Sequence, residues 1–262
     1  MQNTANYGFK KPEDHEAFDQ QNHANWNMDQ IDTQIKNRAD ELSAHLAENM
    51  PHSTASNINY YVNAATGNDN NDGLSSVTAF KTFAKAIGKI PLVVQHTITI
   101  NVAAGNYNEE IGLYNYIGRG NIIIKGSAAL ADTHLIVRPL IVGCACNIEI
   151  SGFKCTTTGN SVSINYCTNV KLTYIKAIEV SVSNGIGVLV YSSKAIIENC
   201  EISNKQSRGI LATYCSTVYS TNNTGSGNTI AIGSEYTSTV GKSGTQPSGT
   251  TAELSNTGGV IR

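Results

Sequence analysis

The sequence predicts a mostly β protein, a parallel β-helix (β-solenoid) preceded by an N-terminal, coiled-coil-like α-helical arm. Three observations predict it. Charged residues make up only 15% of the 262 residues, whereas an ordinary soluble domain has roughly 25%. Acidic residues concentrate at the N-terminus, because residues 1–52 hold four Lys/Arg against nine Asp/Glu. Short β-rich runs then recur at intervals of 20–25 residues, a spacing typical of stacked repeats.

The composition argues against several function classes. A net charge of −2 disfavours nucleic-acid binding, which needs Lys and Arg to neutralise phosphates. The chain has no run of about 18 apolar residues, so membrane insertion is not expected. Met1–Asn6 lacks a basic segment followed by an apolar one, so a secretory signal is not expected either. No P-loop or Gly-x-Ser-x-Gly motif occurs, and no cofactor is predicted.

Residues 1–52 are predicted to form a helical arm for attachment and trimerisation. Glu13–Met50 contains neither Gly nor Pro, and Pro51 then ends the helix. Four apolar residues recur at spacings that suit one helical face. They are Met28, Ile31, Ile35 and Leu42. Because a lone amphipathic helix has nowhere to bury this stripe, a homotrimer is predicted. The alternative is an ordinary helix packed on its own body, since Arg38 and His45 interrupt the heptad pattern.

Residues 53–59 are interpreted as a polar hinge, and residues 97–240 as the repeating coils of the β-helix. One row of similar segments begins at Asn147, Asn169, Lys194 and Ser216, at offsets of 22, 25 and 22. A second row begins at Ser163, Val188, Ile210 and Ile230. A meander sandwich is the competing fold, but the coil-length period favours the solenoid. Residues 241–262, rich in Gly, Ser and Thr, are expected to be an extended C-terminal segment.

The repeat predicts which residues occupy equivalent positions in successive coils. Glu149 is expected to be followed by Lys171, Ile196 and Val218 on the outer surface, a drift towards apolar residues that favours contact between subunits. Outward ladders of Asn, Ser and Thr then explain the low charge. The six cysteines all fall inside the repeat and are expected to be free thiols.

A first resemblance begins at residue 60, after the hinge. The segment Tyr60–Ser75, with its Asn/Asp/Gly turn, and the segment Thr78–Ile87 resemble the cap of pectate-lyase-like right-handed β-helices. Thr97–Glu109 is similar to the first coil of that family. The resemblance implies a right-handed parallel β-helix whose cap spans residues 60–96. Its short helix is expected to cover the core with Phe80, Phe83, Ala84 and Ile87.

A second resemblance lies at the N-terminus. Asn6–Pro12, followed by Asn25–Asp32, is similar to the start of tail and baseplate proteins of phages that infect Gram-positive bacteria. The resemblance implies a trimeric tail fibre, tailspike or neck appendage of a virion or phage-tail-like particle, bound by its N-terminus to a baseplate, tail or neck protein. The positions carrying the motif are the expected particle-attachment residues. They are Pro12, Asn25, Trp26, Asn27, Asp29 and Asp32.

Some relatives in that group cleave polysaccharide, so the Asp and Glu residues of this chain must be considered as catalytic candidates. Glycoside hydrolysis needs two carboxyl groups about 5–9.5 Å apart. The repeat places no carboxylate above another, so no catalytic residue is assigned. Glu198 and Glu201, which are three residues apart in one coil, are the nearest candidates for a catalytic pair. The favoured interpretation is that they are two solvated carboxylates in a turn. No metal site is predicted, because the histidines are too widely spaced and Asp69 and Asp72 suit a turn.

Binding is the remaining function class. Tyr166 maps onto Tyr191, and Tyr214 lies one residue from the next equivalent position. Stacked tyrosines beside Asn and Thr ladders suit glycans, and the alternative is that they fill turns or a subunit interface. The leading hypothesis is therefore a non-enzymatic trimeric appendage that attaches to a bacterial cell-surface polysaccharide. The alternatives are a polysaccharide depolymerase with an intersubunit active site and a purely structural tail or neck component.

Overall fold

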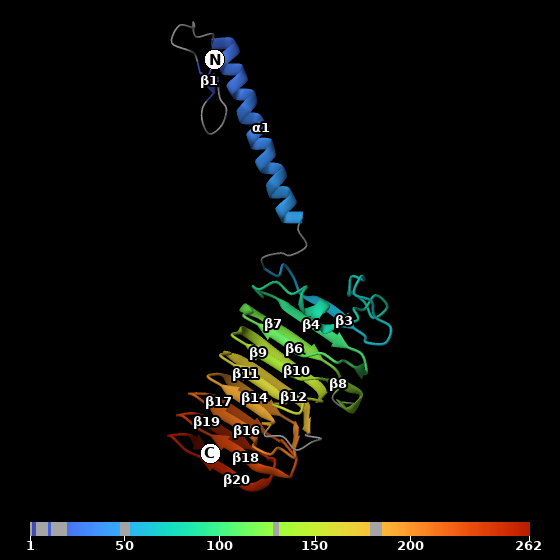
Figure 1. Cartoon of the computed structure of the whole chain (residues 1–262), viewed down its shortest axis with the longest axis vertical. Coiled ribbons are helices and arrows are strands. Elements are labelled where there is room, and N and C mark those ends of the chain that lie inside the picture. Colours follow the sequence, from blue (N-terminus) through green and yellow to red (C-terminus); the bar gives the residue numbers. More distant parts are fainter. Residues whose placement is uncertain (1, 4–9, 12–19, 48–52, 128–130, 179–184) are drawn as a thin grey trace. The chain divides into compact units, whose positions relative to one another are not determined.

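The computed structural model describes the chain except for residues 1, 4–9, 12–19, 48–52, 128–130 and 179–184. The chain divides into two compact units, Met1–Pro51 and His52–Arg262. In the first unit, β1 (Gln2–Asn3) pairs with β2 (Lys10–Lys11) in antiparallel fashion, and α1 spans Gln20–Ala47 (Figure 1). No described helix is long and apolar enough to cross a bilayer.

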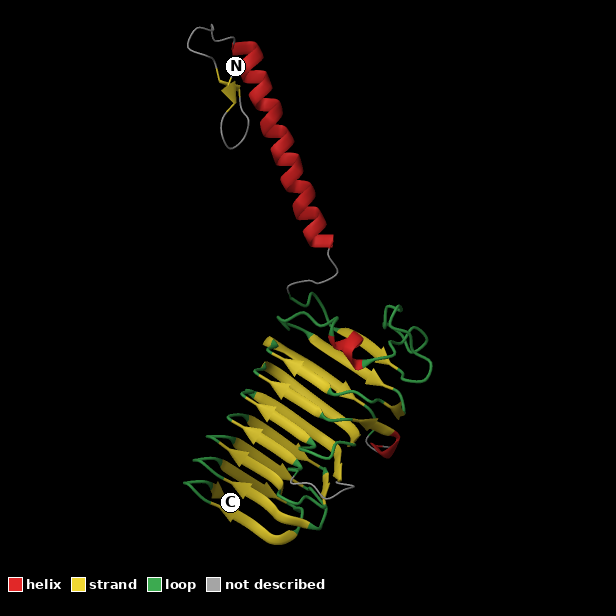
Figure 2. Cartoon of the chain, viewed as in Figure 1, coloured by secondary structure: helices red, strands yellow, loops and turns green. Residues whose placement is uncertain are grey.

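The second unit is a parallel β-solenoid, which confirms the predicted mostly β, parallel β-helix fold of the body. Figure 2 shows strand stacked on strand, coil after coil. The strands are β3 (Ile58–Val62), β4 (Thr97–Val102), β5 (Gly105–Asn106), β6 (Ile111–Tyr114), β7 (Ile117–Lys125), β8 (His134–Ile136), β9 (Pro139–Val142), β10 (Ala145–Cys155), β11 (Val162–Asn165), β12 (Asn169–Ile178), β13 (Val188–Tyr191), β14 (Lys194–Glu198), β15 (Glu201–Ser203), β16 (Arg208–Thr213), β17 (Thr217–Thr221), β18 (Asn228–Ser234), β19 (Thr239–Ser243), β20 (Gly249–Ser255) and β21 (Val260–Ile261).

Two sheets form the walls of about seven coils. The long sheet runs in the order β21-β19-β17-β14-β12-β10-β7-β4-β3, and the seven-stranded sheet in the order β20-β18-β16-β13-β11-β9-β6. Alternate residues point inward, so Ile122, Ile148, Val170 and Ala195 stack in one core row. The predicted coil-length repeat therefore corresponds to real backbone pairing.

The predicted register is correct at first and then slips. Asn147 pairs with Asn169, as expected. Lys194, however, pairs with Thr217 instead of Ser216. The cause is a longer turn, because two residues separate β13 from β14 whereas three separate β16 from β17. A slip of one residue exchanges the two faces of a strand.

This slip corrects the expected outer row. Val218 is 1% exposed and belongs to the core, and Tyr219, at 48% exposed, follows Ile196 on the outer surface. The second predicted row is shifted as well: Ser163 pairs with Leu189 instead of Val188, and Ile210 pairs with Ile232 instead of Ile230. The drift from charged to apolar and aromatic side chains nevertheless persists, with Tyr219 in place of Val218.

A cap covers the core beside β3 and β4. Helix α2 (Phe83–Ile87) begins after Thr82, whose hydroxyl accepts a hydrogen bond from the Lys85 amide. Phe80 and Phe83 are fully buried, as predicted. Ala84 is exposed and Ala86 is buried instead. The helix begins only at Phe83, so its buried face contains Phe83 and the residue three positions later, Ala86. Phe80 precedes the helix and does not set this face.

The remaining short segments are tied into the coils. Thr54 is buried, and its hydroxyl accepts hydrogen bonds from the amides of Gln95 (2.8 Å) and His96 (2.9 Å). In the C-terminal region, β20 pairs with β18 and β21 pairs with β19, so these strands continue the solenoid. The core row that contains Ile232 ends in a charged residue, because Ile232 pairs in register with Glu253. Glu253 forms an ion pair with Lys242.

All six cysteines are free, as predicted, and five of them are buried. Burial raises the pKa of the Cys155 thiol to about 12, so this thiol stays protonated and unreactive near neutral pH. Cys215 is exposed because it lies in the three-residue turn that follows β16. These side chains serve mainly as small core and turn residues.

The register predicts a large loss of stability at one isoleucine and almost none at its neighbour. We expect Ile197→Ala to lower the free energy of unfolding by about 2–5 kcal/mol, because Ile197 is fully buried. Ile196→Ala is the matched control, since Ile196 points outward from the same strand, and its cost should stay within about 0.5 kcal/mol. Urea denaturation of both variants measures this, and equal costs would contradict the register.

Candidate functional site

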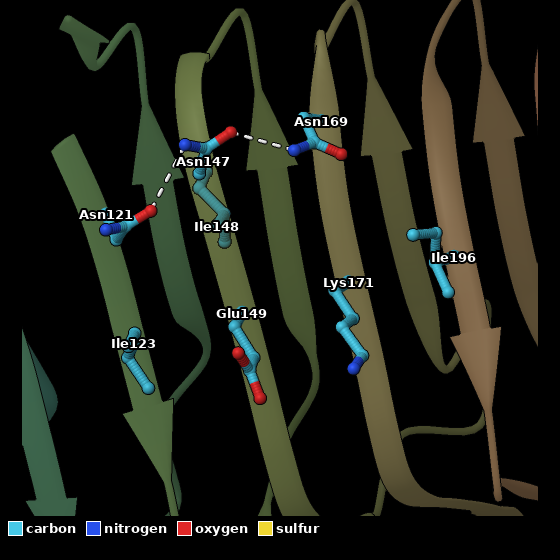
Figure 3. A pocket seen from close by; sticks show the side chains of 8 residues that line it. All are labelled: Asn121, Ile123, Asn147, Ile148, Glu149, Asn169, Lys171 and Ile196. Atoms are coloured by element: carbon cyan, nitrogen blue, oxygen red, sulfur yellow. Dashed lines mark hydrogen bonds between the residues drawn. The ribbon is translucent and has the colours of Figure 1, made fainter. Parts of the chain in front are cut away.

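A shallow groove of about 320 Å³ lies on the outer face of the long sheet. Its walls come from four successive strands, β7, β10, β12 and β14, so it runs across the strands and along the solenoid. Figure 3 shows the side chains that line it. They are Asn121, Ile123, Asn147, Ile148, Glu149, Asn169, Lys171 and Ile196.

Three asparagines form a ladder along one side of this groove. The Asn169 amide donates to Asn147 Oδ1 (2.8 Å), and the Asn147 amide donates to Asn121 Oδ1 (3.1 Å). Asn121 in turn donates to the Thr97 hydroxyl (2.9 Å). The ladder follows from the parallel register, which places identical side chains directly beside each other. It confirms, for this row, the expectation of outward polar ladders.

The opposite side of the groove carries charge between two apolar ends. Glu149 pairs in register with Lys171, and Ile123 and Ile196 occupy the flanking strands of the same row. Lys171 forms its ion pair with Glu198 instead, at 3.2 Å. Among the described residues, Glu149 has no hydrogen-bond or ion-pair partner. The groove therefore keeps one carboxylate available for a ligand.

The structure places Glu198 and Glu201 at the end of β14 and the start of β15. They pair in register with Thr173 and Lys176, as the repeat predicts. Each carboxylate faces a lysine, because Glu198 contacts Lys171 and Glu201 lies 3.6 Å from Lys176. This arrangement supports paired surface charges.

A second charged cluster lies beside this one and was not anticipated. Asp132, in the 3₁₀ turn Ala131–Thr133, contacts Lys154 at 3.2 Å and Lys176 at 2.5 Å. Hydrogen bonds from Lys176 and then Lys154 lower the pKa of the Asp132 carboxyl. The repeat could not reveal this cluster, because Asp132 lies outside the repeated rows and only folding brings it over the two stacked lysines.

The predicted tyrosines form one continuous row of neighbouring rings, edge to face for Tyr166–Tyr191 and tilted for Tyr191–Tyr214. Ring centroids are 5.2 Å apart for Tyr166–Tyr191 and 4.6 Å apart for Tyr191–Tyr214. The row also contains Tyr236, whose ring lies 4.6 Å from Tyr214 at an interplanar angle of 11°. The sequence reasoning counted Tyr236 only among the other tyrosines of the coils. The turn after β16 is one residue longer than the turn after β13. Allowing for this extra residue would have placed Tyr236 in the same row as the other three tyrosines.

This tyrosine ladder, Tyr166, Tyr191, Tyr214 and Tyr236, occupies the corner between the two sheets. Three of its members have left-handed backbone conformations, with φ of 56° at Tyr166, 53° at Tyr214 and 48° at Tyr236. Such a conformation costs of order 1–3 kcal/mol for a residue other than glycine. The rings are nevertheless solvent-exposed, at 59%, 44% and 44% respectively. The Tyr214 and Tyr236 rings stack face to face, whereas Tyr166 and Tyr191 meet edge to face at an interplanar angle of 70°. The ladder therefore presents ring edges, part of a ring face and hydroxyl groups.

The two aspartates of the cap serve the local fold. Asp69 accepts hydrogen bonds from the amides of Lys81 and Thr82 and from the Thr82 hydroxyl, which fixes the start of α2. Asp72 accepts from the Leu74 amide and the Thr78 hydroxyl, and these bonds lower its pKa. In the described part of the chain, no group of three or more His, Cys, Asp or Glu is gathered to hold a metal ion.

The expected attachment and trimerisation residues belong to the arm. Asn25, Trp26, Asn27, Asp29 and Asp32 lie in α1, and Pro12 is outside the described residues. The four residues of the apolar stripe are all exposed in the single chain. They are Met28 (63%), Ile31 (44%), Ile35 (62%) and Leu42 (58%).

Comparisons with known proteins now bear on the fold. A family model described as "Protein of unknown function (DUF1565)" matches residues 65–257. No curated protein matches the chain. Among solved structures, a GH136 lacto-N-biosidase from Eubacterium ramulus (selenomethionine derivative) shows 10% identity and a TM-score of 0.19, over 92% of this chain and 72% of that chain. A likeness this weak supports no inference about activity.

The Asp132 cluster predicts a small effect of acid on stability. Its carboxyl pKa is lowered in the folded chain, so the stabilisation is present above the ordinary carboxyl pKa of about 4. It is lost as pH falls through the lowered folded value. We expect Asp132→Asn to cost under about 1 kcal/mol near neutral pH and nothing in strong acid. Urea midpoints at both pH values measure this, and a cost that persists in acid would contradict it.

Proposed function

The chain belongs to the DUF1565 family, whose description names no function. We propose that it is a glycan-binding appendage of a phage or phage-tail-like particle; the geometry of the site supports glycan binding, and the resemblance of the N-terminal segments supports the particle. In this proposal three copies of a right-handed β-helix associate through the arm, and the N-terminus attaches to a baseplate, tail or neck protein. The coils bind a bacterial cell-surface polysaccharide. The proposal concerns attachment to that polysaccharide and assigns no cleavage to the chain.

The tyrosine ladder is the observation that carries this proposal. Large aromatic side chains stand exposed at three positions where glycine would relieve the left-handed backbone. Stability alone does not account for exposed rings at strained positions, so a binding role is the better explanation. A row of ring edges and phenol hydroxyls suits a ligand rich in hydroxyl groups, which donate and accept hydrogen bonds at every sugar.

The pairing of the two candidate catalytic carboxylates supports binding over cleavage. Glu198 and Glu201 are both paired with lysine, and the described carboxylates show no closely apposed pair in one register row. A depolymerase would need two carboxyl groups flanking the scissile bond. An active site shared between subunits is the alternative that the enzymatic test below addresses.

The arm supports self-association. Its four apolar side chains are exposed on a helix that offers them no partner within the described residues of its own unit. Water contact with such a stripe is unfavourable by roughly 25 cal/mol per Å², so association of three copies would bury it. A trimer would also present three weak glycan sites together, which raises avidity through effective concentration.

Removing the tyrosine edges tests the glycan proposal. We expect the combined variant Tyr166→Ala/Tyr214→Ala to lose at least tenfold in affinity for bacterial surface polysaccharide, measured by surface plasmon resonance on immobilised glycan. Tyr114→Ala is the matched control, because Tyr114 is a similarly exposed tyrosine at 47% that stands outside the ladder. Equal losses in both variants would contradict a role for the ladder.

The same glycan samples test for cleavage. We expect no release of reducing ends by the unmodified chain over prolonged incubation. Steady release that Glu198→Gln or Glu201→Gln abolishes would replace the binding proposal with a depolymerase. Retained particle assembly without any glycan binding would indicate a purely structural component.

The arm makes a separate prediction. We expect the full chain to be trimeric by light scattering and the variant Ile31→Asp/Ile35→Asp to be monomeric, because a buried unpaired charge opposes association. Gln34→Asp is the control, since it adds a charge to the same helix outside the apolar stripe and should leave the trimer intact. A monomeric unmodified chain would contradict the trimer.

A further inference from the structure

We infer that the groove on the long sheet is a subsite for the acetamido group of an N-acetylated polysaccharide, held between Asn169 and Ile196. The inference rests on the proposed function and names the substrate class of that function. It uses residues that the tyrosine ladder does not include. Figure 3 shows the two side chains on neighbouring strands at one end of the groove.

The asparagine ladder ends with an acceptor that lacks a donor. An asparagine side chain offers two N–H donors and a carbonyl oxygen with two acceptor positions. Asn121 Oδ1 and Asn147 Oδ1 each accept from the next asparagine. Asn169 Oδ1 accepts from no described residue. The β12–β14 register begins at the Val170–Ala195 pair, so the residue that follows Asn169 in its row is Lys194, which brings no amide to continue the ladder.

An acetamido group completes this ladder. Its N–H donates to Asn169 Oδ1 as the next asparagine would, so the ligand continues a geometry that the protein has already repeated. A sugar hydroxyl is able to donate as well, but it brings no methyl group. Ile196 also lines the groove, on the strand next to that of Asn169 and in the row of Lys171, and its outward apolar surface matches the acetyl methyl group.

The charged side of the groove supplies the remaining partner. The Lys171 ammonium has three donors, and Glu198, at 3.2 Å, is the one partner that the described residues give it. A remaining Lys171 donor serves the acetamido carbonyl, and the unpaired Glu149 carboxylate accepts from sugar hydroxyls. N–H, carbonyl and methyl thus each meet a matching group, namely Asn169, Lys171 and Ile196.

The same charges disfavour a second copy of this chain as the occupant. Packing another sheet over the groove would remove Glu149 and the Lys171–Glu198 pair from water, a desolvation cost that an ion pair often fails to recover. A hydrated polysaccharide leaves part of these groups in solvent. The groove crosses four strands about 4.8 Å apart, and an extended pyranose chain advances by a similar distance per sugar, so its sugars follow the coils.

Two neutral oligosaccharides of equal length test the inference. We expect the full-length chain to bind a tetramer of β-1,4-linked N-acetylglucosamine about three- to tenfold more tightly than a tetramer of β-1,4-linked glucose, the range of one neutral hydrogen bond. Isothermal titration calorimetry measures both. Asn169→Ala and Ile196→Ser should each remove most of this preference while leaving the glucose tetramer unaffected.

The control variant is Thr217→Ala. Thr217 is an exposed residue of the same outer row, beyond the groove, and its loss should leave the preference unchanged. Circular dichroism confirms that each variant keeps the solenoid.

The possible outcomes separate the inference from the proposed function. Equal binding of the two tetramers, abolished by the tyrosine variant, would overturn the acetamido subsite and leave the glycan proposal standing. A preference that survives Asn169→Ala and Ile196→Ser would also overturn the subsite. No binding of either tetramer or of bacterial polysaccharide would overturn both.

Discussion

Parallel hydrogen bonding between successive coils is the constraint on which the rest of this structure depends. Each strand of the long sheet pairs with the equivalent strand of the next coil, from β3 through to β21. Every residue therefore lies beside the residue one coil earlier, and rows of like side chains run along the solenoid. A polar row stays polar only while the register is kept, because a slip of one residue exchanges inside and outside.

The outer surface shows what such rows allow. Amide groups in adjacent coils satisfy one another, as Asn121, Asn147 and Asn169 do, so the surface stays polar with few charges. Several of the charges that remain are paired, with Lys171 on Glu198 and Lys176 on Asp132, whereas Glu149 is left for a ligand. The shortage of charged residues in the composition is thus partly a consequence of coil stacking.

The two proposed binding features lie at the end of one row and along a corner of the coils. The asparagine ladder ends at Asn169 because the next coil carries Lys194 in that row. The tyrosine ladder stands in the corner turns, where left-handed residues reverse the chain direction. These two places differ chemically from the neighbouring coils, so a ligand could recognise them. Their chemistry, with amide, hydroxyl and ring edges, is the basis for proposing an N-acetylated glycan.

Much of the fold was determined by the sequence alone. Alternating apolar residues and a coil-length period predicted the solenoid and the Asn147–Asn169 pairing, because periodicity is a local property. The burial of Phe80 and Phe83 was expected from the resemblance of their segment to a β-helix cap. The tertiary structure decided what depends on turn length and on distant segments. One extra residue after β16 buried Val218, exposed Tyr219 and brought Tyr236 into the ladder. The position of Asp132 over two lysines and the unpaired Asn169 oxygen likewise follow from register and packing in three dimensions, which no local pattern in the chain encodes.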